Sequence, residues 1–272
     1  MRAVATKAAG AERAALKGHS TTYVMIERRD SSRHFTIHTE QDTDVGSMTE
    51  FKRPDGQAVQ GYLSEADDAV GSLVVIQEWW GLNDQIRGVA DRLSRAGFNA
   101  LVPDLFRGQS ALDAEEAHHL MTGLNFGDAA SQDVRGAVQF LKARGGKVGV
   151  TGFCMGGALT VLALTMAPEA DAGVVWYGYP PLSYVDASKI TAPMMAHWAT
   201  QDSAFAISGV DALEEKLQSA GVRYEGHRYL AHHAFANEMA QGPTRISITQ
   251  YDAAWAQTAW DRTLRFFGRQ LG

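Results

Sequence analysis

The stretch GFCMGG, residues 152–157, holds the only cysteine of the chain. It follows a short apolar run at 147–153 and leads at once into a helix-like run at 155–166. This is the G-x-nucleophile-x-G pattern of a sharp strand-to-helix turn, with Cys in place of the usual Ser. The helix N-terminus favours a thiolate on Cys154. Free cysteines are often buried core residues, but the flanking glycines and the turn favour a nucleophile.

A cysteine nucleophile needs a general base, and that base needs a group to orient it. In this kind of turn the acid and then the histidine follow the nucleophile along the chain. Asp202 comes directly after the apolar run 192–199 and is the predicted acid, with a turn or helix-cap role as its alternative. His232 and His233 follow the last predicted strand. Spacing alone does not choose between these two histidines.

A carboxylate and two tryptophans follow another apolar run. Glu78 ends the run 72–78 and is followed by Trp79 and Trp80. Since Glu78 ends a buried strand, we expect it at the same sheet edge as Cys154. A carboxylate there can be a solvated cap, but two consecutive tryptophans favour the wall of an aromatic pocket.

Apolar runs and helical patterns alternate from residue 58 onward, which predicts an α/β fold with a mostly parallel sheet and helices on both faces. In such a sheet, ligands bind at the carboxyl ends of the strands. The predicted strands span 72–78, 98–105, 147–153, 172–178, 192–199 and 222–230. The predicted helices span 84–97, 113–121, 128–144, 155–166, 210–221 and about 249–270.

Composition excludes several classes of protein. The chain has 272 residues, a net charge of -6 and no basic excess, so we expect no nucleic-acid partner. It lacks an apolar run of about 18 residues, so we expect no membrane span. One cysteine excludes an intrachain disulfide framework and a cysteine-based zinc site, and a lone thiol predicts a cytoplasmic location. We expect no metal or organic cofactor, and a monomer or weak homo-oligomer.

One domain is predicted from Met48 to the end of the chain, residues 48–272. Residues 1–47 form an N-terminal extension, rich in alanine and basic at its start but without the apolar segment of a signal peptide. Composition does not settle whether this extension is ordered or disordered.

Six motifs in order resemble the dienelactone hydrolases (carboxymethylenebutenolidases) of the α/β-hydrolase superfamily, over about residues 55–270. They read VIQEWWGLN, GFNALVPDLF, GKVGVTGFCMGGAL, VVWYG, TQDSAF and HHAFAN. The resemblance implies the α/β-hydrolase fold and a triad of Cys154, His233 and Asp202, with His233 chosen because it directly precedes Ala-Phe. It also implies an oxyanion hole from the backbone N–H groups of Trp79 and Met155.

The resemblance further implies that Glu78 contacts the thiol and helps to generate the thiolate. The chain departs from the family where a substrate carboxylate would bind. Asn237 stands where the family has an arginine, Ala234 stands in place of a serine, and a family tyrosine aligns with His118. Arg107 is the cation that could still serve.

These features predict a hydrolase that cleaves a small ester or lactone through a thioester acyl-enzyme. The substrate is dienelactone-like or, given the lost anion-binding residues, a more apolar or aromatic ester. Its pocket would be formed by Trp80, His118, Tyr177 and Asn237. The alternatives are a relative that binds a small molecule without catalysis and a redox sensor that uses the lone thiol.

Overall fold

The structure is a computed structural model of the chain and describes residues 13–16, 22–25, 36–38, 45–243 and 245–272. Residues 1–45 and 46–272 are two separate compact units. The first contains a small antiparallel sheet of strands β1 (Arg13–Leu16), β2 (Thr22–Met25) and β3 (Thr36–His38). Most of the predicted extension, residues 1–47, lies outside the described residues.

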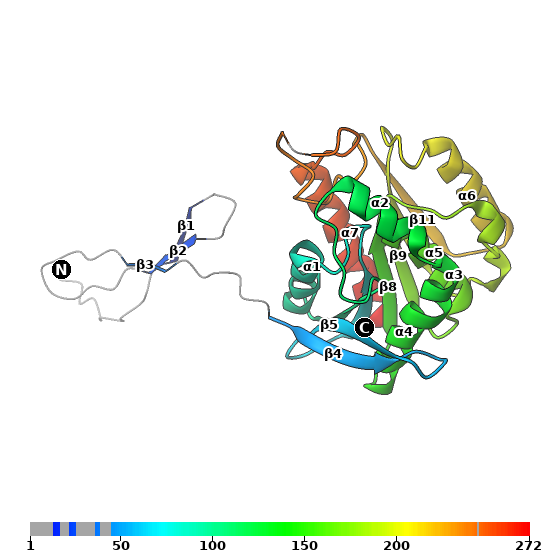
Figure 1. Cartoon of the computed structure of the whole chain (residues 1–272), viewed down its shortest axis with the longest axis horizontal. Helices are drawn as coiled ribbons and strands as arrows, with labels where there is room; N and C mark the ends of the chain where they lie inside the picture. Colours follow the sequence, from blue (N-terminus) through cyan, green and yellow to red (C-terminus); the bar gives the residue numbers. More distant parts are fainter. Residues whose placement is uncertain (1–12, 17–21, 26–35, 39–44, 244) are drawn as a thin grey trace, which may run out of the picture. The chain divides into compact units, whose positions relative to one another are not determined.

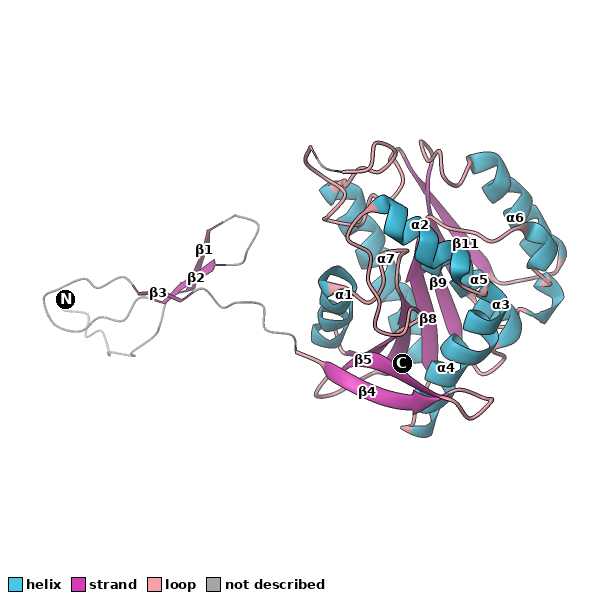
Figure 2. Ribbon diagram, viewed as in Figure 1, coloured by secondary structure: helices cyan, strands magenta, loops and turns pink. Residues whose placement is uncertain are grey.

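The second unit is built on an eight-stranded sheet in the order β11-β10-β9-β8-β6-β7-β5-β4 (Figure 2). The six strands from β6 to β11 are parallel, and β5 and β4 extend the sheet antiparallel at one edge. Their bounds are β4 Ser47–Lys52, β5 Ala58–Ser64, β6 Gly71–Ile76, β7 Phe98–Pro103, β8 Val148–Phe153, β9 Ala172–Trp176, β10 Met194–Ala199 and β11 Tyr224–Tyr229. The predicted α/β class with a mostly parallel sheet is confirmed.

Helices cover both faces of this sheet (Figure 1). Side chains of α1 and α7 pack with one face, and those of α4, α5 and α6 pack with the other. The central strands are buried on both sides, since Leu73 and Val74 of β6 belong to opposite cores. The helices are α1 Asp84–Arg95, α2 Ala114–Gly123, α3 Phe126–Asp128, α4 Arg135–Ala143, α5 Met155–Met166, α6 Ile207–Ser219 and α7 Ala253–Leu271.

Three local features differ from the predicted elements. The β4–β5 hairpin was not among the predicted strands, and its turn uses Gly56 with φ +88°. The last helix begins at Ala253 and not near 249, because the side chain of Asp252 caps it. The stretch from 129 to 134 is a π-helix that leads into α4, where a continuous α-helix was predicted.

Candidate active site

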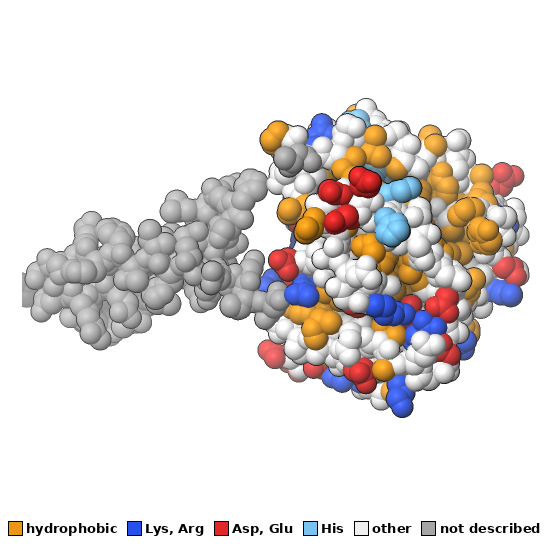
Figure 3. Space-filling model, viewed as in Figure 1, with side chains coloured by type: hydrophobic (Ala, Val, Ile, Leu, Met, Phe, Trp, Pro, Cys, Tyr) orange, Lys and Arg blue, Asp and Glu red, His pale blue; other side chains and the backbone are white. Residues whose placement is uncertain are grey.

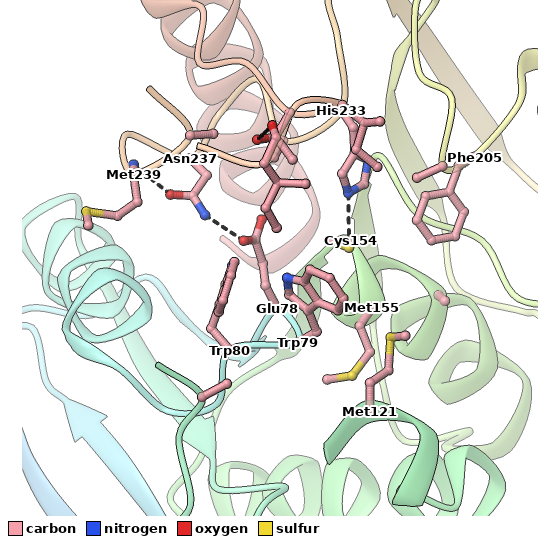
Figure 4. Close-up of a pocket in the computed structure, with 18 of the residues that line it drawn as sticks. Glu78, Trp79, Trp80, Met121, Cys154, Met155, Phe205, His233, Asn237 and Met239 are labelled. Carbon is pink, nitrogen blue, oxygen red and sulfur yellow. Dashed lines mark hydrogen bonds between the residues drawn. The ribbon is translucent and has the colours of Figure 1, made fainter. Parts of the chain in front are cut away.

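Cys154 occupies the turn between β8 and α5, at the carboxyl end of the parallel strands (Figure 4). Its backbone has φ +54° and ψ -114°, a strained conformation for a residue with a side chain. The turn lies directly against neighbouring backbone. A Cβ added at Gly156 would lie 2.6 Å from the carbonyl oxygen of Gln77, and one added at Gly152 would collide with the carbonyl of Gly156. The turn therefore requires both glycines, and it directs Cys154 out over the sheet edge.

A chain of hydrogen bonds leads away from the thiol. His233 Nε2 lies 3.1 Å from Cys154 Sγ, and His233 Nδ1 lies 2.7 Å from Asp202 Oδ2. The other oxygen of Asp202 accepts hydrogen bonds from the backbone N–H groups of Ala204 and Phe205, at 2.8 and 2.9 Å. These bonds fix the carboxylate, which in turn fixes the ring of His233. Of the two histidines that spacing left open, His232 and His233, it is His233 that contacts the sulfur.

The charge on His233 is governed by its neighbours. Burial opposes a charged imidazole, but the Coulombic interaction with Cys154 and the hydrogen bonds to Asp202 and Cys154 outweigh it and raise the pKa of His233 to about 10. The imidazolium is thus favoured at neutral pH. This arrangement can hold a proton between sulfur and substrate and deliver it from Nε2.

Two backbone N–H groups belong to the residues that directly follow Glu78 and Cys154. Trp79 follows Glu78 after the end of β6, and Met155 is the first residue of α5 (Figure 4). Within the described part of the chain, neither of these N–H groups donates a hydrogen bond. Both are therefore available to an oxygen atom of a bound substrate, as an oxyanion hole requires.

Glu78 is buried, with 4% of its surface exposed. The hydroxyl of Tyr177 donates to its Oε1 at 3.2 Å, and Nδ2 of Asn237 donates to its Oε2 at 2.6 Å. Burial raises the pKa of Glu78. No hydrogen bond joins Glu78 to Cys154 among the described residues, so the thiol contact implied by the family resemblance is not made in this structure. The carboxyl is instead held by Tyr177 and Asn237.

A cavity of about 640 Å³ opens above Cys154. Its walls are mostly apolar and aromatic, and they include Trp80, Met121, Phe126, Phe205, Met239 and Ile248. Trp80 and Asn237 line it as predicted. Arg245, an exposed residue of the rim, is the one Lys or Arg among the described lining residues.

Two predicted pocket residues do not line this cavity. Tyr177 lies behind its wall, 1% exposed and bonded to Glu78, because the end of β9 points it into the core. His118 is exposed on α2, where histidine and acidic side chains gather on the outer surface (Figure 3). Met121, three residues further along α2, reaches the cavity in its place. Arg107 also fails to serve the site, since it is ion-paired with Asp133 at 2.7 Å.

Several lining residues were not found from the sequence. Phe205 follows Asp202 in the loop after β10, and Met239 and Ile248 lie in the long segment between β11 and α7. These loop positions show neither periodicity nor chemistry-bearing side chains. The one signal was the aromatic residue in TQDSAF, which sits next to the predicted acid.

The model of the dienelactone hydrolase family matches residues 59–271 of the chain. The chain belongs to the dienelactone hydrolase family. The predicted enzyme class, a carboxylic ester hydrolase, is thereby confirmed. Over 238 residues the chain is 33% identical to the protein usf of Aquifex pyrophilus, covering 84% of this chain and all of the relative.

Solved structures share the fold of this dienelactone hydrolase family member. One is a dienelactone hydrolase-like promiscuous phosphotriesterase from metagenomic libraries, with a TM-score of 0.73, 22% identity, and coverage of 84% of this chain and 100% of that one. Another is an esterase of Pyrococcus furiosus, with a TM-score of 0.60, 18% identity, and coverage of 84% and 93%.

The described residues of this hydrolase lack two kinds of feature. None of their helices combines the length and apolar character needed to cross a bilayer. They also hold no group of three or more His, Cys, Asp or Glu side chains with the geometry of a metal site.

Proposed function

We propose that this protein hydrolyses small esters or lactones with Cys154 as nucleophile, His233 as acid and base, and Asp202 as the group that orients His233. The observation that carries the proposal is the continuous chain from Sγ through the imidazole to Asp202 Oδ2, with contacts of 3.1 and 2.7 Å, beneath an apolar cavity. Neither a binding protein nor a redox sensor requires this chain of groups.

The reaction proceeds through a thioester. The thiol proton resides on His233 Nε2, and the sulfur attacks the substrate carbonyl, whose oxygen takes up the negative charge. The N–H groups of Trp79 and Met155 hold that oxygen. The tetrahedral intermediate collapses, the C–O bond breaks, and the leaving alkoxide takes the proton from Nε2. Water then gives a proton to Nε2 as it attacks the thioester, and Cys154 leaves with the carboxylic acid released.

The cavity favours a substrate that is apolar and uncharged near the reacting carbonyl. Its walls carry aromatic rings such as Trp80, Phe126 and Phe205, whereas the cation Arg245 stands at the rim. Aromatic or branched alkyl esters and lactones fit such walls, because apolar area removed from water contributes about 25 cal/mol per Å². We also infer that the protein acts in the cytoplasm, where a single reactive thiol stays reduced.

The proposal is tested with 4-nitrophenyl esters. Wild-type protein should release a burst of nitrophenol equal to its active sites, and mass spectrometry after acid quenching should find the acyl group on Cys154. Cys154→Ala should lose the burst and the turnover, while its thermal unfolding stays cooperative. Hydrolysis by Cys154→Ala at the wild-type rate would refute the proposal. A rate of peroxide consumption above that of ester hydrolysis would favour the redox sensor.

A further inference from the structure

The buried carboxyl of Glu78 has only neutral hydrogen-bond partners. Tyr177 and Asn237 are themselves 1% and 3% exposed, so water does not replace them. No Lys or Arg forms an ion pair with Glu78 among the described residues. A buried carboxylate without a cation carries a large desolvation cost, which a proton on the carboxyl removes.

The orientation of Asn237 shows which oxygen of Glu78 can carry that proton. Asn237 Oδ1 accepts the backbone N–H of Met239 at 2.9 Å, so its Nδ2 must face Glu78. Nδ2 can only donate, and Oε2 of Glu78 therefore acts as an acceptor. Oε1 faces the hydroxyl of Tyr177, and a hydroxyl oxygen can accept as well as donate. A proton on Oε1 would reverse the Tyr177 bond, so that Oε1 donates to the hydroxyl oxygen while Nδ2 of Asn237 still donates to Oε2.

The charged and polar groups around the site act in both directions, and burial outweighs those that favour an ionised Glu78. The groups that act on Glu78 are the nearby His233, its hydrogen-bond partners Asn237 and Tyr177, and the acidic Glu238. The positive His233 favours an ionised Glu78, but that ring already lies between the carboxylate of Asp202 and the sulfur of Cys154. An ionised Glu78 would add another negative charge beside the negative sulfur that the proposed reaction uses. Glu78 and Cys154 both line the cavity, and like charges within one partly buried site disfavour each other.

We propose that Glu78 carries its proton in the resting enzyme, where Tyr177 and Asn237 hold it as a neutral acid on the cavity wall. It is then a positioning residue that does not act as a base toward Cys154. It also keeps the cavity floor uncharged, and the substrates are esters and lactones without a carboxylate near the reacting carbonyl. The substrate class rests on the proposed function, but the protonation of Glu78 does not.

The first experiment observes the carboxyl directly in wild-type protein. Glutamate labelled with ¹³C at the side-chain carboxyl gives one NMR resonance per glutamate. At pH 7 we expect one of them at the position of a protonated acid, lost in Glu78→Gln and moved in Tyr177→Phe. A spectrum at pH 7 with every glutamate at the carboxylate position would overturn the proposal. This measurement needs no turnover, so it stands apart from the test of ester hydrolysis.

The second experiment measures the rate of Cys154 alkylation by iodoacetamide against pH. If Glu78 is neutral, Glu78→Gln should leave the midpoint of this profile within about 0.3 pH units of wild type. If Glu78 is ionised, removal of its charge should move the midpoint to lower pH by about one unit or more, and that result would overturn the proposal. Asp202→Asn is the control, because it removes a carboxylate from the same charge chain and should move the profile.

The third experiment tests the substrate class. Wild-type protein is given two 4-nitrophenyl esters of similar length, pentanoate and the monoester of glutaric acid, which differ in a terminal carboxylate. We expect kcat/KM to be at least about tenfold higher for the pentanoate, which corresponds to about 1.4 kcal/mol. Equal rates, or a preference for the glutarate ester, would overturn the substrate class while leaving Cys154-dependent hydrolysis intact.

Discussion

Replacing Gly156 by alanine adds only one methyl group, but we expect it to lower the rate of catalysis strongly. The added Cβ would lie 2.6 Å from the carbonyl oxygen of Gln77 and closer still to that of Ile76, whereas ordinary contact begins at 3.4 Å, so the elements must separate by at least about 3.4 - 2.6 = 0.8 Å. One of these elements is the start of α5, which carries Cys154 and the N–H of Met155. The other is the end of β6, which leads to the N–H of Trp79. The substitution thus widens the space that the proposed oxyanion hole spans.

Two magnitudes follow from that displacement. Misplacement of reacting groups by about 1 Å costs about 10²-fold in rate, so we expect kcat/KM to fall by about that factor. Overpacking of a close contact costs about 1–3 kcal/mol, which lowers the melting temperature of a domain of this size by several degrees.

The assay is hydrolysis of a 4-nitrophenyl ester, with thermal unfolding measured on the same samples. The matched control is Gly268→Ala in α7, where an added Cβ meets nothing within 4 Å. Because alanine is the better helix former, this control should unfold at the wild-type temperature or higher and keep full activity. Equal kcat/KM values for the two alanine variants would refute the reasoning about the turn.

Three further outcomes are expected. Leu112→Ser and Met239→Ser, two exposed apolar residues of the cavity rim, should lower kcat/KM about fivefold for octanoate esters but not for acetate esters; equal losses for both esters would contradict this. Activity should fall as pH rises through about 10, where His233 loses the proton it delivers to the leaving group; a flat profile to pH 11 would contradict it. Burial lowers the pKa of His197 in the native state. Below about pH 6.5 the unfolded chain binds a proton at this histidine that the native state does not bind, so the free energy of unfolding decreases as the pH is lowered. Wild type should thus lose more stability than His197→Gln between pH 6.5 and 5 in urea titrations, and equal losses would contradict this.

Those parts of the fold could be predicted whose sequence pattern lies within a few consecutive residues. The buried strand of β6 was recognisable because a sheet covered on both faces demands a continuous apolar run. The turn at Cys154 was recognisable because Gly152 and Gly156 each stand two positions from the cysteine, although the backbone that crowds Gly156 belongs to residues 76 and 77. The antiparallel edge hairpin was missed, since β4 is mostly exposed and lacks such a run. The end of α7 nearest the site was misplaced because a single cap, Asp252, decides where it begins.

The surroundings of the site were beyond sequence reasoning for a different reason. The partners of Glu78 lie 99 and 159 residues further along the chain, at Tyr177 and Asn237, and nothing in their local sequence marks them as a pair. Tyr177 reads as an aromatic residue at a strand end, which fits a pocket wall as well as the core. His118 was placed by alignment in a helix whose facing only the packed structure decides. Chain order sufficed to predict Asp202 and the pair His232 and His233, because strand ends meet at one edge whatever the loops do, and only the family resemblance chose between the two histidines.

The division of labour between strand ends and loops has a consequence for how this hydrolase can change. Glu78, Cys154 and Asp202 stand at or just beyond strand ends that a large core holds in place. Phe205 and Met239 stand on loops, and their own side chains are not part of that core. Substitutions at these wall positions should therefore change the stability of the fold little, whereas substitutions at the strand ends beneath them should change it strongly. Natural evolution or a laboratory library can thus change which esters the cavity accepts, while the catalytic residues stay the same and the fold loses little stability.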